Sequence, residues 1–158
     1  MKDNSHDTSR GRKLQRKLES YRMSATFCNE HGCERRPMKP LFFAPTDIQP
    51  GELTAELQER LKASKNLIVI CSPHSAHSDW VGKEIACFHS LGRTDNILFF
   101  IIDGIPHSGN HDTDCFHSIV ESLGLPEVII VPKSKTTCKI IKYLVILQPK
   151  SERSGQFK

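Results

Sequence analysis

The only tryptophan of the chain, Trp80, precedes a carboxylate, Glu84, by four residues in the segment SPHSAHSDWVGKEIACFHS. On a helix this spacing places both side chains on one face, and Val81, Ile85 and Phe88 form the adjacent apolar stripe. A carboxylate at the edge of an apolar surface is costly unless it is paired or used in chemistry. The pattern therefore indicates either a functional carboxylate beside an aromatic wall, or a core tryptophan with a glutamate on the solvent side.

Hydrophobic periodicity predicts the elements that hold this pair. The run NLIVIC (66–71) is apolar and β-branched, which is typical of a strand buried on both faces. A helix over 78–91 follows, with Ser78 as its N-cap and Gly92 at its end. Open parallel sheets bind ligands beyond the carboxyl ends of their strands. Because Ser72 directly follows the strand, its position favours this loop and the next helix as the site.

Strands and helices alternate along the rest of the chain. Apolar runs predict a short strand at 40–45 and buried strands at 96–103 and 127–131, and helical periodicity predicts helices at 11–23, 53–64 and 114–124, with a polar loop at 24–40. The alternation predicts an α/β fold with a mostly parallel sheet and helices on both faces.

Composition limits the class of protein. A chain of 158 residues, 37% apolar and 25% charged, suits one globular domain. The polar start predicts no signal peptide, and the apolar runs are shorter than the roughly 20 residues of a membrane span. The net charge is +4, and the basic helix 11–23 is more typical of a solvated face than of a nucleic-acid site, since no aromatic pattern accompanies it. Six cysteines without regular spacing favour a reducing, cytoplasmic setting.

Two segments combine histidine with cysteine, namely CNEHGC (28–33) and HSGNHDTDCFH (107–117). Neither has the paired ligand spacing of a structural zinc site. Both contain Gly and Asn, which is typical of surface loops. We therefore expect no metal site and no cofactor.

The segment TDIQPGELTAELQERLKASKNLIVICSPHSAHSDWVGKEIACFHSLGR, continued by NILFFIIDG, resembles the middle of a bacterial Toll/interleukin-1 receptor (TIR) domain. The shared features are an acidic loop with Pro-Gly, a helix, a buried strand ending in Cys-Ser-Pro, and the pattern Trp-x-x-x-Glu. The resemblance implies a flavodoxin-like fold with a TIR domain over residues 5–131. Residues 132–158 do not resemble the usual ending of the family, and we expect a disordered tail there.

Many TIR domains cleave NAD⁺ into nicotinamide and a linear or cyclic ADP-ribose. The resemblance therefore implies an NAD⁺ glycohydrolase of bacterial signalling or defence, with NAD⁺ as its substrate. The positions that match the family make Glu84 the catalytic residue. They make Trp80, Ser72, Asp47 and His6 the substrate-binding residues.

The family also implies contacts between TIR domains. The loop with Asp47, Pro50, Gly51 and Glu52 matches the loop that gates the pocket and mediates self-association. The alternative function is therefore a non-catalytic interaction module that binds a second copy or a partner TIR protein.

The start of the chain departs from the family pattern, which is a Phe-Ile-Ser-Tyr strand followed by Ser-His and an Asp. Ser5, His6 and Asp7 are kept here, but MKDN stands in place of the strand. Because that strand is central in the family fold, we expect the strand at 66–71 to have an unpaired edge. This predicts poor stability and weak or absent cleavage of NAD⁺.

Overall fold

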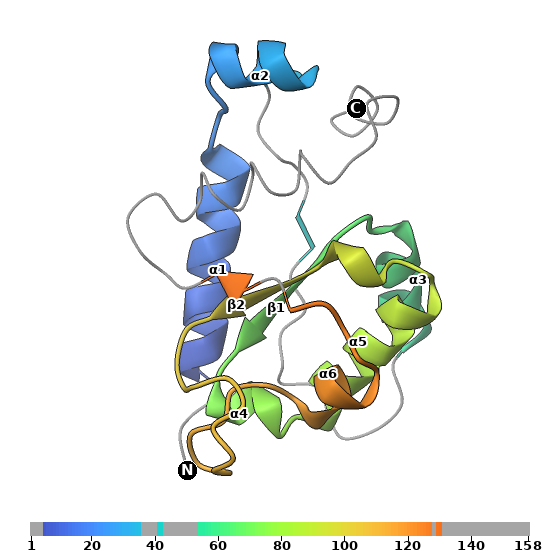
Figure 1. Ribbon diagram of the computed structural model, residues 1–158. Helices are drawn as coiled ribbons and strands as arrows, with labels where there is room; N and C mark the ends of the chain where they lie inside the picture. Colours follow the sequence, from blue (N-terminus) through green and yellow to red (C-terminus); the bar gives the residue numbers. More distant parts are fainter. Residues whose placement is uncertain (1–4, 36–40, 43–53, 128, 131–158) are drawn as a thin grey trace. The chain divides into compact units, whose positions relative to one another are not determined.

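The computed structural model describes residues 5–35, 41–42, 54–127 and 129–130. The chain forms two compact units (Figure 1). The first comprises residues 1–10 and 44–132, and the second comprises residues 11–43 and 133–158. Each unit is described by itself.

A three-stranded parallel sheet lies in the first unit, with the order β1 (Leu67–Cys71), β2 (Ile97–Ile101), β3 (Ile129–Ile130). Val69 lies beside Phe99 in the β1–β2 ladder. All five side chains of the middle strand β2 are buried. Within the described residues β1 pairs with β2 alone, so it is an edge strand of this sheet. The predicted α/β fold with a parallel sheet is confirmed.

The first unit contains the helices α3 (Ala55–Ala63), α4 (Pro73–Ala76), α5 (Asp79–Ser90) and α6 (Ser118–Ser122), with a 3₁₀ turn at Thr94–Asn96. Helices α3, α5 and α6 lie to one side of the sheet, and α4 lies at one end of it (Figure 1). The hydrophobic core joins α3, α5 and α6 to one face of the sheet, where Ile85, Phe88 and Phe99 are almost fully buried. The opposite face is also covered, because Leu98 is fully buried.

The second unit contains most of α1 (Ser5–Ser20) and all of α2 (Ala25–His31). Residue Leu41 is held against α1 by two hydrogen bonds. Its carbonyl accepts from Gln15 Nε2 at 2.8 Å, and its N–H donates to Glu19 Oε1 at 3.0 Å. No helix in the described part of the chain is both long enough and apolar enough to cross a bilayer.

Three predicted elements agree closely with the structure. The helix expected at 78–91 is α5, and its N-cap is Ser78, whose hydroxyl accepts from the Val81 N–H at 3.4 Å. The helix expected at 53–64 is α3, and the buried strand expected at 96–103 is β2.

The predictions for the first 40 residues were wrong in two places. The first helix begins at residue 5 and ends at residue 20, whereas 11–23 was predicted, because SHDTSR has no apolar period to reveal its first turns. The predicted loop 24–40 contains α2, which has local signals at both ends. Ser24 accepts from the Phe27 N–H at 3.2 Å, and Gly32 ends the helix with φ +64°.

The predicted burial of the outer strands was also wrong. In β1 only Val69 and Cys71 are buried, and the other three side chains are half-buried. In β3 the described strand is two residues long and Ile129 is 37% exposed. Both strands flank β2, so within the described residues β2 is the strand with a hydrogen-bonded neighbour on each side.

Two further predictions concern short elements. The helix expected at 114–124 is confined to α6, because His117 caps it and the chain before His117 forms bends. The strand expected at 40–45 is not formed at Leu41 and Phe42, and its other residues lie outside the described ones.

Candidate functional site

The helix α5 places Trp80 and Glu84 one turn apart, as its sequence predicts. Trp80 is 6% exposed and belongs to the hydrophobic core, and Glu84 is half-buried. In an α-helix each Cα–Cβ bond tilts toward the N-terminus, so the Glu84 side chain leans toward the turn that contains Trp80. The tryptophan is therefore a core residue, but the glutamate is not on the solvent side.

Burial raises the pKa of Glu84 from 4.5 to about 7, because its surroundings penalise the charged form. The Trp80 indole N–H acts in the opposite direction and lowers this pKa. The indole N–H is itself buried, and it has no hydrogen-bond partner among the described residues. The indole therefore lies near the carboxyl group without a regular hydrogen bond to it. Glu84 is thus a carboxyl group that changes charge near neutral pH.

The carboxyl end of β1 is held by a buried network around Ser72. Its hydroxyl donates to Asp7 Oδ2 and accepts from the Ser75 N–H at 3.1 Å. The Ser72 N–H donates to Ser75 Oγ at 2.9 Å, which completes a capping box on α4. Ser72 is 2% exposed and Asp7 is 9% exposed. The Ser72 hydroxyl is therefore engaged inside the protein, and it shapes the turn that leads to α5.

Ser72→Ala is expected to lower the free energy of unfolding by about 2 kcal/mol, since it removes the cap of α4 and a hydrogen bond to a carboxylate. Urea denaturation at pH 7 measures this loss. Ser122→Ala, which removes an exposed hydroxyl that donates to the Ser118 carbonyl within α6, is the control and is expected to change little. Equal unfolding midpoints for both variants would contradict the structural role of Ser72.

His117 joins α5 to α6. Its ring lies against Gly82, where a Cβ atom would come within 2.6 Å of Cε1 and 2.7 Å of Nε2. Its Nδ1 accepts from the Ile119 N–H at 3.2 Å and so caps α6. This bond requires an unprotonated Nδ1. Burial lowers the pKa of His117, with Asp79 opposing this effect and His77 adding to it.

This lowered pKa predicts a loss of stability in acid. The unfolded chain binds the proton at the ordinary His pKa of 6.5, and the folded protein binds it only at lower pH. The contribution of His117 is therefore fully present above pH 6.5 and is lost as the pH falls through the folded pKa. His117→Ser, which keeps a cap acceptor, is expected to show a smaller loss between pH 7 and pH 5. Parallel stability curves for the two proteins in urea would contradict this.

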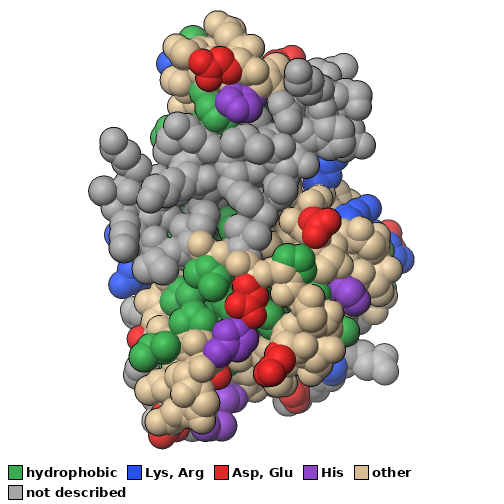
Figure 2. Space-filling view, viewed as in Figure 1, with side chains coloured by type: hydrophobic (Ala, Val, Ile, Leu, Met, Phe, Trp, Pro, Cys, Tyr) green, Lys and Arg blue, Asp and Glu red, His purple; other side chains and the backbone are tan. Residues whose placement is uncertain are grey.

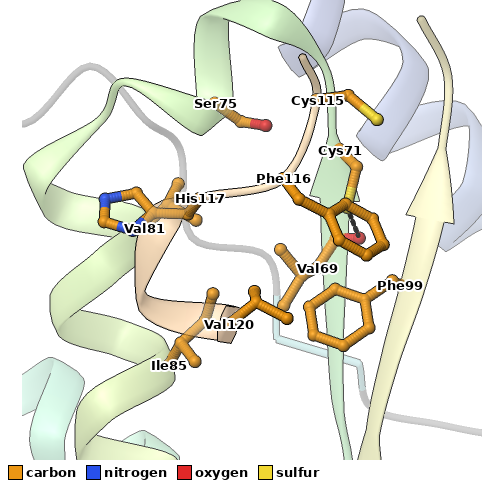
Figure 3. A pocket seen from close by; sticks show the side chains of 10 residues that line it. All are labelled: Val69, Cys71, Ser75, Val81, Ile85, Phe99, Cys115, Phe116, His117 and Val120. Carbon is orange, nitrogen blue, oxygen red and sulfur yellow. Dashed lines mark hydrogen bonds between the residues drawn. The ribbon is translucent and has the colours of Figure 1, made fainter. Parts of the chain in front are cut away.

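A small pocket lies beside this helix pair, between the sheet and α4, α5 and α6 (Figure 3). It leaves no room for even a water-sized molecule, whereas ligand pockets usually have roughly 300–1,000 Å³. Its lining includes the thiols of Cys71 and Cys115 and the ring of His117, but neither Trp80 nor Glu84. Burial raises the pKa of Cys71 well above its usual value and that of Cys115 to about 11, so neither thiol is an activated nucleophile.

The histidines after β2 make contacts within the protein. His107 Nε2 lies 2.6 Å from Glu127 Oε1, and the rings of His77 and His111 stack at 3.7 Å. Figure 2 shows histidine and acidic side chains at the surface beside apolar ones, and Ile105 is 60% exposed. Among the described residues, no group of three or more His, Cys, Asp or Glu side chains is arranged to hold a metal ion.

The structure describes only part of the predicted site. Glu84, Trp80 and Ser72 lie in the first unit, on α5 and at the start of α4. His6 lies in the first turn of α1, but its side chain is outside the description. The loop residues Asp47, Pro50, Gly51 and Glu52 lie outside the described residues.

The sequence analysis did not include two residues of this region in the predicted site. Asp7 contacts Ser72 across 65 positions of sequence, and His117 contacts Gly82 from another helix. The order Ser5-His6-Asp7, which matches the family pattern, was a signal for Asp7 within the resemblance to the family. No local pattern signals the contact of His117, because only the packing of α6 on α5 creates it.

These observations define a parallel α/β protein in which a carboxylate and an indole lie on α5, the second helix after the carboxyl end of β1. Residues 3–104 match the family described as the TIR-like domain of the Thoeris protein ThsB, and this is more than half of the 158-residue chain. The chain belongs to that family, so the predicted TIR domain is confirmed. The family gives the protein a TIR-domain role in signalling or defence. No curated protein and no solved structure is significantly similar to the chain.

Proposed function

We propose that this TIR domain is an NAD⁺ glycohydrolase, which cleaves NAD⁺ to nicotinamide and a linear or cyclic ADP-ribose. The observation that supports the proposal is the half-buried Glu84 beside Trp80, with a pKa of about 7. Strongly shifted carboxyl groups are concentrated at functional sites. Membership in a TIR family adds independent support, since the pair occupies the Trp-x-x-x-Glu positions.

The bond to nicotinamide breaks without an acid catalyst. The nicotinamide of NAD⁺ is a cationic pyridinium and leaves as a neutral molecule, so no proton has to be supplied, unlike the leaving group of an ordinary glycoside. The ribose develops positive charge as the bond breaks. A carboxylate in a water-poor setting stabilises this charge, and one such group is sufficient.

In this mechanism Glu84 acts in its ionised form. With a pKa of about 7, both the neutral and the charged form of the carboxyl group are populated at neutral pH. The ionised group is then poorly solvated, so it gains more from a cationic ribose than an exposed carboxylate does. Trp80 forms an apolar wall beside it.

The test is the release of nicotinamide from NAD⁺ by the purified chain, with the products separated by chromatography. Nicotinamide release is expected from the wild type and is expected to be lost in Glu84→Ala. Glu121→Ala, which removes an exposed carboxylate from α6, is the control and should retain the activity. Circular dichroism establishes that the variants remain folded. Turnover that persists in folded Glu84→Ala would refute the assignment.

Association between TIR domains is a second function that the family supports. The predicted contacts involve the loop with Gly51 and the helix α3. Association is expected to depend on protein concentration and to weaken in Gly51→Arg, as measured by sedimentation without NAD⁺. Identical sedimentation of the two proteins would count against this interface.

A further inference from the structure

The side chain of Trp80 has a polar atom that the hydrophobic role of the residue does not use. The residue is 6% exposed, and its Nε1 is one of the few buried polar side-chain atoms without a hydrogen-bond partner in the described part of the chain. Buried N–H groups without an acceptor are rare, because their desolvation is not compensated. A buried indole N–H of this kind therefore suggests a nearby acceptor with which it forms a hydrogen bond in some states of the protein and not in others.

Glu84 is the acceptor that α5 brings to this N–H. It lies four residues further along the helix, and its side chain leans back toward the turn of Trp80. Burial raises the pKa of Glu84, and among the described side chains the N–H of Trp80 lowers it. No charged side chain among the described residues contributes to that pKa.

We propose that the indole N–H of Trp80 is the positioning donor of Glu84, and that it forms a full hydrogen bond when the carboxylate is ionised. This proposal deepens the proposed function and rests on it for its catalytic meaning. A hydrogen bond from the N–H stabilises a charged carboxylate more than a protonated carboxyl group, because hydrogen bonds to ionised acceptors are stronger. The bond selects one side-chain conformation of Glu84 and stabilises its charged form without adding a second charge.

The proposal separates two properties of one residue. The ring of Trp80 fills the core and excludes water, which raises the cost of charging Glu84, whereas its N–H lowers that cost and fixes the carboxylate. Trp80→Phe retains much of the ring and removes the N–H. Because Trp80 is the only tryptophan of the chain, incorporation of benzothienylalanine also replaces this N–H by sulfur with little change of shape.

The experiment is a ¹³C NMR titration of the Glu84 carboxyl group in the folded protein without NAD⁺. Glu84→Gln identifies the signal. The wild-type midpoint is expected at about pH 7, and both replacements of Trp80 are expected to move it upward by about one pH unit. Phe116→Leu removes ring atoms elsewhere in the same core and is expected to leave the midpoint unchanged.

An unchanged or lower midpoint in both Trp80 replacements would overturn the proposal. The titration does not depend on turnover, so it distinguishes this failure from a failure of the proposed function. In the NAD⁺ assay, Trp80→Phe, which keeps an aromatic ring in the apolar wall, is expected to lower kcat about tenfold through its effect on the carboxylate. A raised midpoint with no nicotinamide release from the wild type would support the hydrogen bond and overturn its catalytic meaning.

Discussion

Replacement of Glu84 by Gln is expected to stabilise the protein at pH 8 by about 2–3 kcal/mol, and to lower NAD⁺ cleavage by about a hundredfold or more. The pKa of Glu84 is raised from 4.5 to about 7 by burial. The folded state therefore disfavours the charged carboxylate that the unfolded chain carries above pH 4.5. Gln has the same shape and no charge, so it removes this penalty together with the charge that the reaction needs.

The pH dependence of this effect has a definite sign. The penalty is absent below pH 4.5, increases as the pH rises, and is complete above about pH 7. The difference in unfolding free energy between Glu84→Gln and the wild type is therefore expected to be large at pH 8 and below about 1 kcal/mol at pH 5. Urea denaturation at both pH values measures it, and contributions from other groups, such as His117, cancel in the difference.

Glu121→Gln is the matched control for this experiment. Its carboxylate is exposed on α6, so the same chemical change is expected to have little effect at either pH. Equal stabilities of Glu84→Gln and the wild type at pH 8 would show that Glu84 is not electrostatically penalised. The proposed function would then lose its main structural support.

The second large effect is expected at Gly82, where Ala should lower the free energy of unfolding by about 2–4 kcal/mol. Ala is normally favoured over Gly in a helix by about 1 kcal/mol. Here its Cβ would lie 2.6 Å from the His117 ring, which is closer than packing allows. Displacement of the ring adds the cost of overpacking, about 1–3 kcal/mol, to the loss of the cap on α6.

A double-mutant comparison isolates this contact. In a His117→Ser background the ring is absent and a hydroxyl remains to cap α6. Gly82→Ala is then expected to be neutral or to stabilise by up to about 1 kcal/mol, because only its helix propensity remains. Urea denaturation of the four proteins measures the coupling. A loss of equal size in both backgrounds would show that His117 does not limit the space at Gly82.

Other predictions remain open to experiment. The poor stability expected from MKDN in place of the first family strand stays a prediction. Within the described residues β1 has one ladder partner, β2. The roles of Asp47 and His6 also stay predictions, as does the boundary of the domain near residue 131.

The sequence determined the elements whose signals are local. The run at β2 is apolar throughout, so it predicts a buried strand whatever its neighbours are, and the chain places it in the middle of the sheet. Ser78, the apolar stripe and Gly92 likewise predict α5 and the shared face of Trp80 and Glu84. These features depend on residues a few positions apart, so they can be predicted from the sequence without knowledge of the fold.

Only the tertiary structure decided what those elements do together. An apolar run does not determine how many neighbouring strands will pair with it. The partial exposure of the outer strands was therefore not predicted. The pairing of Asp7 with Ser72 and the packing of His117 on Gly82 join segments with no pattern in common. The same holds for Glu84. Its spacing from Trp80 is local, but its pKa of about 7 comes from desolvation by residues that folding brings around it.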